Sequence, residues 1–191
     1  MFLISRVGEK INFLGEFLKK ENKVGSVAPS SKFLVKKMIA PIDFRKAKVI
    51  VEFGPGTGVI TDEILKKMSA DCKLYAFEIN KEFVGKLSSI KDNRFKLIED
   101  SAEKIEEYLL KDGIANADYV VSSLPLAIIP REIEYNILNA ASRSLKTGGS
   151  FIQFQYSLSS RKKLKEIFHS IKTNFTPINI PPAFVFTCIK G

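Results

Sequence analysis

The hydrophobic and polar positions change their period along the chain, and from residue 48 onward two patterns alternate. Short apolar runs typical of strands cover 48–53, 73–78, 95–99, 117–122 and 150–156. Helical patterns fill 59–69, 81–90, 101–111, 131–145 and 159–171, and two further strands are expected within 173–189. Runs such as VIVEF are apolar on both faces, which is typical of a parallel sheet covered by helices on each side. The alternation predicts an α/β, doubly wound, Rossmann-like fold.

Two helices are predicted ahead of this alternation. Within 6–20, apolar residues recur at helical spacing, namely Val7, Ile11, Leu14 and Leu18. A turn-rich connector follows, and a second helical pattern, KFLVKKMIA, stops before Pro41 because proline cannot continue a helix. We therefore expect a single domain, 1–191, with an N-terminal helical extension in 1–40 and the Rossmann-like core in 48–191.

Composition narrows the class of protein. The chain has 191 residues, of which 45% are hydrophobic, as expected of one globular domain with a full-sized core. No apolar run approaches the ~18–20 residues of a membrane span, and the start of the chain lacks a signal-peptide core. With one His and two Cys that form no metal-binding motif, no metal is expected. These features predict a cytoplasmic protein.

Charge is unevenly distributed. The formal net charge is +9, and residues 1–50 carry +7 of it, from 11 Lys/Arg against 4 Asp/Glu. A basic N-terminal region is either a solvated face or a surface that meets an anionic partner. The anionic partners to consider are nucleic acid and a lipid surface.

The stretch KVIVEFGPGTGVIT, residues 48–61, indicates a ligand site. Glycines between a strand and a helix let a ligand approach the backbone where a Cβ would clash, and the helix offers free N–H groups. Gly54, Gly56 and Gly58 are spaced G-x-G-x-G, whereas the dinucleotide fingerprint is G-x-G-x-x-G. The third glycine is out of place for a dinucleotide, and the other cofactor that such turns bind is S-adenosylmethionine.

Acidic residues lie at the ends of three successive predicted strands. Glu52 is inside an apolar run, where a carboxylate needs a cation or several donors. It would repel a pyrophosphate but not the amine and sulfonium of S-adenosylmethionine. Glu78 can accept hydrogen bonds from both ribose hydroxyls, Asp100 can accept one from the adenine amino group, and Ser101 offers a backbone N–H. Taken singly, Glu78 and Asp100 are equally typical of ordinary strand-end caps.

The glycines and the three acids occur together at successive predicted strand ends. In this the chain resembles the class I S-adenosylmethionine-dependent methyltransferases over about residues 48–156, most specifically in EFGPGTG. The resemblance implies a seven-stranded sheet whose last strand is antiparallel. It also implies a cofactor site at the strand ends. We predict that this site comprises Glu52, Gly54, Gly56, Gly58, Glu78, Asp100 and Ser101.

The acceptor loop of this class follows the fourth strand, here within DYVVSSLPLAIIP, residues 118–130. In the ribosomal RNA adenine dimethylases, which the loop resembles in part, the sequence is Asn-Leu-Pro-Tyr. The matching residues here are Ser123, Leu124, Pro125 and Leu126. The amide that binds the base amine and the ring that stacks on the base are both missing. Base stacking contributes roughly 1–3 kcal/mol, so its loss counts against adenine as the acceptor.

A resemblance to the bacterial-type phospholipid N-methyltransferases extends over about residues 24–189. It is carried by GSVAPSS, VEFGPGTGVIT, SSLPL, FIQFQY and NIPPAFVF. That family methylates phosphatidylethanolamine with S-adenosylmethionine, so the resemblance implies methyl transfer to the amine headgroup of a phospholipid. The family usually has Ser-Gly-Leu-Pro where this chain has Ser-Ser-Leu-Pro, so Ser123 is a departure that bears on the acceptor.

Methyl transfer from a sulfonium needs a neutral amine held in line with the methyl group, and it moves positive charge onto the nitrogen. Aromatic faces stabilise such a cation, and Tyr156, with Phe154 two residues before it on the same face, is predicted to line the pocket. Core packing is the competing role of both rings. The predicted catalytic set is Tyr156, Ser123, Leu124 and Pro125. A lipid phosphate is expected at Ser30, Ser31 and Arg131. Helix capping is the competing role of the two serines, and a solvated helix face is the competing role of Arg131.

A lipid substrate would give residues 1–20 a role. An apolar stripe with basic flanks is typical of a helix that lies in an anionic membrane interface, so peripheral membrane association through this segment is expected. Packing of the same stripe on the domain's own sheet is the alternative. Two other functions stay open. One is an RNA adenine N6-methyltransferase, and the other is a non-catalytic lipid- or nucleic-acid-binding module with the same fold.

Overall fold

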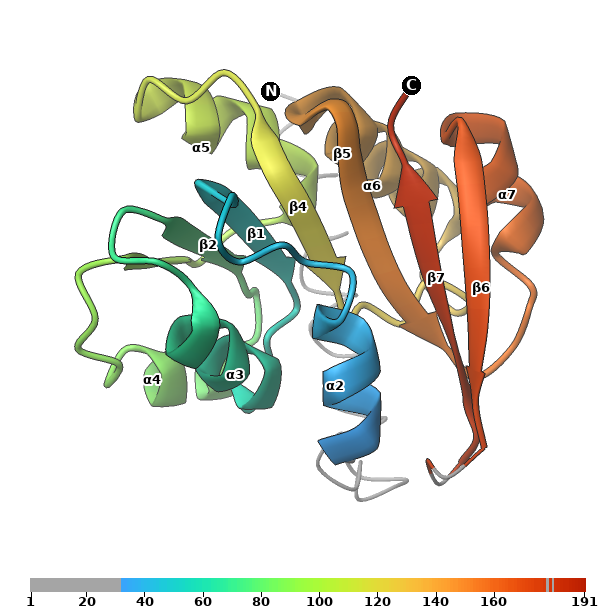
Figure 1. The fold of residues 1–191 in the computed structure, drawn as a ribbon, viewed down its shortest axis with the longest axis horizontal. Helices are drawn as coiled ribbons and strands as arrows, with labels where there is room; N and C mark the ends of the chain where they lie inside the picture. Colours follow the sequence, from blue (N-terminus) through green and yellow to red (C-terminus); the bar gives the residue numbers. More distant parts are fainter. Residues whose placement is uncertain (1–31, 178, 180) are drawn as a thin grey trace, which may run out of the picture.

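The computed structural model describes residues 32–177, 179 and 181–191. One mixed sheet of seven strands lies at the centre of this part of the chain (Figure 1). The strand order is β3-β2-β1-β4-β5-β7-β6. The strands are β1 (Val49–Phe53), β2 (Lys73–Phe77), β3 (Phe95–Ile98), β4 (Ala117–Ser122), β5 (Leu145–Gln155), β6 (Ser170–Thr176) and β7 (Ala183–Ile189). The doubly wound, Rossmann-like fold predicted from the hydrophobic pattern is confirmed.

The direction and register of the strands place several strand ends at one edge of the sheet. β1 pairs in parallel with β2 and β4, whereas β7 runs antiparallel to both β5 and β6. The antiparallel last strand is thus as predicted. Phe53, the last residue of β1, is level with Phe77 of β2 and Ser122 of β4. The segments that follow these strands therefore emerge together at what we call the carboxyl edge, where open α/β sheets bind ligands.

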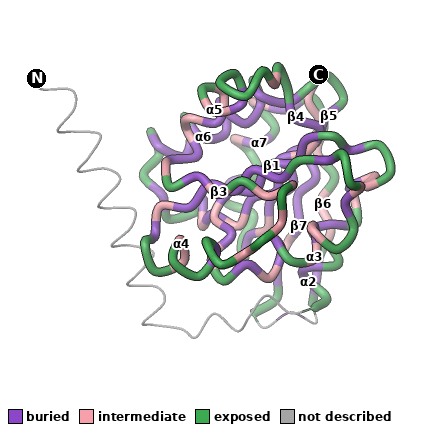
Figure 2. The backbone as a smooth tube through the Cα atoms, turned by 90° about the vertical axis from the view of Figure 1, so that its left-hand side faces the viewer, coloured by how far each residue is buried: buried purple, intermediate pink, exposed green. Residues whose placement is uncertain are grey.

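Helices cover both faces of the sheet (Figure 1). They are α2 (Lys32–Ile39), α3 (Val59–Lys67), α4 (Lys81–Leu87), the 3-10 turn η1 (Ala102–Lys104), α5 (Ile105–Lys111), α6 (Arg131–Ser144) and α7 (Arg161–Ile167). Apolar residues of α2 and α3 pack on one face, and those of α5, α6 and α7 pack on the other. The central strands are buried between these layers, as Figure 2 shows.

Helix α2 is a layer of the fold rather than an extension of it. Its buried residues, Leu34, Val35, Met38 and Ile39, belong to the same core cluster as residues of β1 and α3. The apolar face of KFLVKKMIA is therefore used for packing on the sheet. The other predicted helix, 6–20, lies outside the described residues.

Two predicted boundaries on the C-terminal side were wrong. Strand β5 begins at Leu145 rather than at residue 150, because the ladder with β4 continues from Ala117 through a shift of register. Gly149 allows this, since a Cβ there would lie 2.8 Å from the carbonyl oxygen of Lys146. The helix predicted for 159–171 ends at Ile167, and β6 already begins at Ser170. Pairing with β7 therefore overrides the helical pattern at these positions.

Candidate active site

The glycine turn after β1 has a backbone that disfavours other residues. Gly54, Gly56 and Gly58 have φ of 65°, 57° and 84°, a region that side chains with a Cβ rarely adopt. A Cβ on Gly56 would meet nothing nearer than a ring atom of Phe83 at 4.0 Å, so the backbone there is open to a ligand. A Cβ on the buried Gly58 would lie 3.1 Å from Leu87 of α4. Of these two, Gly56 can line a ligand and Gly58 serves packing.

Glu52 is a fully buried carboxyl group beside this turn. Its Oε2 accepts a hydrogen bond of 2.7 Å from the Thr61 hydroxyl of α3, and its Oε1 has no partner among the described residues. Burial raises the pKa of Glu52 to about 8; the Thr61 bond opposes this rise, and the charges of Glu78 and Asp62 add to it. A buried carboxyl with an unused acceptor oxygen fits a cationic group of a ligand.

Glu78 connects the end of β2 to the glycine turn. Its Oε1 accepts the N–H groups of Ile79 and Asn80 at 2.9 and 2.8 Å, and its Oε2 accepts that of Gly56 at 3.1 Å. Burial raises the pKa of Glu78 above its usual range, while these backbone bonds counteract the rise. Three donors leave one in-plane acceptor position, on Oε2. A ribose hydroxyl can bind there, so the geometry favours one hydroxyl at this carboxylate rather than both.

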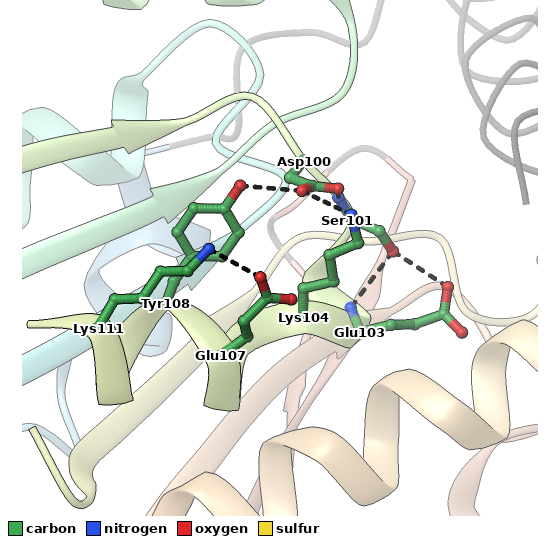
Figure 3. Close-up of polar contacts among 7 residues, drawn as sticks. All are labelled: Asp100, Ser101, Glu103, Lys104, Glu107, Tyr108 and Lys111. Atoms are coloured by element: carbon green, nitrogen blue, oxygen red, sulfur yellow. Dashed lines mark hydrogen bonds and ion pairs between the residues drawn. The ribbon is translucent and has the colours of Figure 1, made fainter. Parts of the chain in front are cut away.

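Asp100 and Ser101 follow β3 at the same edge. Asp100 Oδ1 accepts the Ser101 N–H at 2.8 Å (Figure 3). The Ser101 hydroxyl accepts the N–H of Glu103 at 3.3 Å and therefore caps η1. Because β3, β2 and β1 are neighbours, the structure brings the three predicted acids to one edge in the order of their strands.

The loop after β4 lies against the glycine turn. The Ser123 N–H donates to the carbonyl oxygen of Phe53 at 2.9 Å, and a Cβ on Gly54 would lie 2.8 Å from Cδ2 of Leu124. The absence of a side chain at Gly54 is thus what lets Leu124 approach. Leu126, which stands where the RNA dimethylases have a stacking ring, is fully buried.

Gln153 of β5 supports this loop and was not predicted. Its Nε2 donates to the carbonyl oxygens of Leu124 at 2.9 Å and Phe154 at 2.6 Å. Gln153 is opposite Ser122 in the β4–β5 ladder and is fully buried. A glutamine between the apolar residues Ile152 and Phe154 was the available signal, but its partner depends on which strand lies beside β5.

Of the two aromatic residues at the end of β5, one packs against the core and the other lies at the surface. The rings of Phe154 and Tyr156 meet edge to face, with centroids 5.7 Å apart and an angle of 75°. Phe154 is half-buried against the core cluster that includes α2, whereas Tyr156 lies one residue beyond the strand and is 49% exposed. Core packing therefore accounts for Phe154 more fully than for Tyr156.

The residues predicted to meet a phosphate are not brought together by any described contact. Arg131 is exposed as the first residue of α6. Ser30 and Ser31 lie outside the described residues. Within the part that is described, no cluster of three or more His, Cys, Asp or Glu residues could hold a metal ion, and no helix is long and apolar enough to cross a bilayer.

Comparison with known proteins identifies the family. Residues 23–176 match the family described as the methyltransferase small domain. An ornithine lipid N-methyltransferase from Singulisphaera acidiphila is 31% identical over 179 residues, which are 92% of this chain and 93% of that protein. The chain belongs to the methyltransferase small domain family. The enzyme is thus an S-adenosylmethionine-dependent methyltransferase, which argues against the non-catalytic alternative.

More distant similarities support the same fold. A ribosomal RNA small subunit methyltransferase A from a Sulfurihydrogenibium species is 34% identical over 116 residues, 56% of this methyltransferase but 44% of that protein. The crystal structure of a precorrin-6y C5,15-methyltransferase from Geobacter metallireducens superposes with a TM-score of 0.66 at 16% identity, covering 83% of this chain and 88% of that one. At such identity the likeness shows the fold alone.

Proposed function

We propose that this methyltransferase transfers a methyl group from S-adenosylmethionine to the amine nitrogen of a lipid headgroup. The observation that carries the proposal is the similarity to the ornithine lipid N-methyltransferase, which extends over nearly the whole of both chains. The similarity to the ribosomal RNA enzyme covers less than half of that protein. Ornithine lipid is therefore the first substrate to test and phosphatidylethanolamine is the second.

The acceptor loop supports a small amine over a nucleobase. A flipped adenine needs an aromatic face to stack on, and stacking contributes roughly 1–3 kcal/mol per base. Leu126 at the corresponding position is fully buried, so it offers no surface on which a base could stack. RNA adenine N6-methylation remains the alternative function, and this loop counts against it.

The residues at the carboxyl edge have distinct roles in the proposed reaction. S-adenosylmethionine supplies an electrophilic methyl group and leaves as S-adenosylhomocysteine. Glu52 and Glu78 bind its cationic and ribose portions, and the loop at Ser123 and Leu124 places the neutral amine beside the glycine turn. The nitrogen forms the new C–N bond as the S–C bond breaks, and the resulting ammonium later releases its proton to water. Tyr156 stabilises the positive charge that develops on nitrogen.

The surface around the acceptor loop suits a lipid substrate. At this edge, the described residues of 123–130 and 156–160, together with residues 177, 179, 181 and 182, include no acidic residue. Exposed apolar side chains stand on or beside them, namely Ile128, Tyr156, Leu158 and Phe175. The helices that follow the first two segments begin with exposed basic residues, Arg131, Arg161 and Lys162. Apolar loops with basic flanks are typical of proteins that rest on an anionic membrane surface.

Methyl transfer in the presence of both acceptor classes tests this function. Purified enzyme is given S-adenosylmethionine with a labelled methyl group, together with lipid vesicles and stripped ribosomal RNA. We expect the label in the organic phase. Tyr156→Ala should lower kcat while S-adenosylmethionine binds nearly as before, and Tyr135→Ala, a change at an exposed tyrosine of α6, is the matched control. Label in RNA and none in lipid would refute the proposal.

A further inference from the structure

The carboxylate of Asp100 accepts hydrogen bonds from three donors (Figure 3), and these leave an acceptor position on only one of its oxygens. Oδ2 accepts hydrogen bonds from the Lys104 ammonium and from the Tyr108 hydroxyl, each at 2.9 Å. Oδ1 accepts the Ser101 N–H at 2.8 Å. A carboxylate oxygen offers about two in-plane lone pairs. Oδ2 is therefore saturated, and the remaining acceptor position is on Oδ1.

The Asp100 side chain is partly accessible and its carboxylate is ionised. The side chain of Asp100 is 15% exposed. Burial opposes its ionisation, but the bonds from Lys104, the Ser101 N–H and Tyr108 together hold the pKa of Asp100 below its usual value. An ionised carboxylate only accepts hydrogen bonds and cannot donate one. The free position on Oδ1 thus suits an N–H donor and repels a carbonyl oxygen.

Tyr108 is fixed by contacts outside the Asp100 cluster. Its ring meets that of Phe77 edge to face, with centroids 5.7 Å apart and an angle of 81°. Phe77 is the last residue of β2 and directly precedes Glu78. The ammonium of Lys111 lies 4.9 Å from the centre of the Tyr108 ring. The hydroxyl that binds Asp100 is therefore placed relative to the strand that carries Glu78.

We propose that Lys104 and Tyr108 are positioning residues that make the cofactor site select the 6-amino group of adenine, by saturating Asp100 Oδ2 and directing Oδ1 toward that group. The inference rests on the proposed role of Asp100 as the adenine ligand. It is independent of which acceptor the enzyme methylates. Neither side chain is predicted to touch the cofactor, so each acts through the Asp100 carboxylate.

A purely structural role makes a different prediction. Lys104 and Asp100 are four residues apart, as are Lys86 and Glu82, which form a comparable pair of 2.8 Å on α4. If the Asp100 pair only steadied the start of η1, its loss would weaken the binding of every ligand alike. If it orients Oδ1, its loss weakens only ligands that have the amino group.

Two ligands that differ at one edge of the purine separate these roles. Dissociation constants are measured by calorimetry for S-adenosylhomocysteine and for S-inosylhomocysteine, in which an oxo group replaces the adenine amino group and N1 carries a hydrogen. The wild type should prefer the adenosyl ligand by roughly tenfold or more, the size of one hydrogen bond to a charged group. Tyr108→Phe and Lys104→Met should each reduce this preference at least threefold, through weaker binding of the adenosyl ligand alone.

Three controls complete the test. Tyr135→Phe and Lys86→Met make the same changes elsewhere on the surface and should leave the preference at its wild-type value. Asp100→Asn should lower the preference at least as far as the Tyr108 and Lys104 variants do, because an amide can rotate to donate to the oxo group. Thermal unfolding establishes that the Tyr108 and Lys104 variants are folded. The positioning role is overturned if these variants keep the wild-type preference, or if they bind both ligands more weakly by the same factor. If Asp100→Asn leaves the preference unchanged, Asp100 does not bind the adenine amino group, and the premise of the positioning role is overturned.

Discussion

Glu52 is completely buried and has an unused acceptor oxygen. For this reason the protonation state of Glu52 should change when the cofactor binds. Burial raises its pKa to about 8, so the carboxyl is largely protonated near pH 7 before a ligand arrives. A cationic group placed beside Oε1 favours the ionised form and lowers the pKa. Binding of S-adenosylmethionine should therefore release a proton at neutral pH, and this release should diminish above about pH 8.

Calorimetry in buffers of different ionisation enthalpy measures this release directly. The apparent binding enthalpy of the wild type should change from buffer to buffer, with the sign of proton release. Glu52→Gln removes the titrating group and should make the enthalpy nearly independent of the buffer. A wild-type enthalpy that does not depend on the buffer at pH 7 would show that the cation does not bind at Glu52.

At the residue scale, the sequence allowed the prediction of groups whose position follows from a strand end. Gly54, Gly56 and Glu78 were predictable because a strand-to-helix turn fixes where they emerge. Thr61 and Tyr108 were not, because their bonds to Glu52 and Asp100 depend on how helices pack on the sheet. The Lys104 bond to Asp100 has the spacing of four residues that a helix start allows, whereas the second bond to Oδ2, from Tyr108, depends on the fold.

At the scale of elements, β5 and the loop after β4 work as a unit through Gln153. Gln153→Leu removes the bond to the carbonyl oxygen of Leu124 and should let this loop move away from the glycine turn. We expect kcat to fall roughly tenfold, the equivalent of about 1.4 kcal/mol of lost positioning. The dissociation constant for S-adenosylmethionine should change less than about twofold, because the acids that bind it lie on β1, β2 and β3.

Gln155→Leu is the matched control, since Gln155 is buried two residues along the same strand face and has no described bond to the loop. Steady-state kinetics and cofactor titration on both variants decide the matter. Equal losses of kcat in the two variants would show that the effect comes from disturbing β5 and not from releasing the loop.

The same scale shows which elements the hydrophobic pattern could predict. The buried parallel strands were located because each is a short apolar run between helical patterns. The start of β5 was missed because Lys146 to Gly149 has the composition of a turn, yet Leu145 before it already pairs with Ala117 and the ladder resumes at Ser150 after a shift of register. The end of α7 was missed because a helical period persists past Ile167, where pairing of β6 with β7 decides the structure.

At the scale of the whole molecule, charge and exposed apolar residues predict membrane binding from two regions. One is residues 1–20, within the first fifty residues that carry +7, and the other is the edge that holds Ile128 and Leu158. Each basic residue near an anionic surface contributes about 1 kcal/mol, screened by salt. Pelleting with acidic vesicles should exceed pelleting with neutral ones and should decrease in high salt.

Two changes separate the two regions in a vesicle sedimentation assay. A variant without residues 1–20 should pellet less with acidic vesicles, and Ile128→Asp with Leu158→Asp should pellet less with every vesicle. Neither change removes any of the acids of the predicted cofactor site, so S-adenosylmethionine affinity should stay at its wild-type value. If the shortened variant pellets like the full chain, residues 1–20 are not an anchor.

The central claim is that the methyl group reaches a lipid amine, and mass spectrometry of the product tests it most directly. Vesicles that contain both ornithine lipid and phosphatidylethanolamine are incubated with the full chain and S-adenosylmethionine, and the extracted lipids are fragmented. The account predicts ornithine lipid heavier by one methylene unit or more, with the added mass retained on the headgroup fragment that contains the amine. The account would be contradicted if the added mass were on an acyl chain. It would also be contradicted if the lipids were unchanged while the same enzyme methylated adenine in supplied RNA.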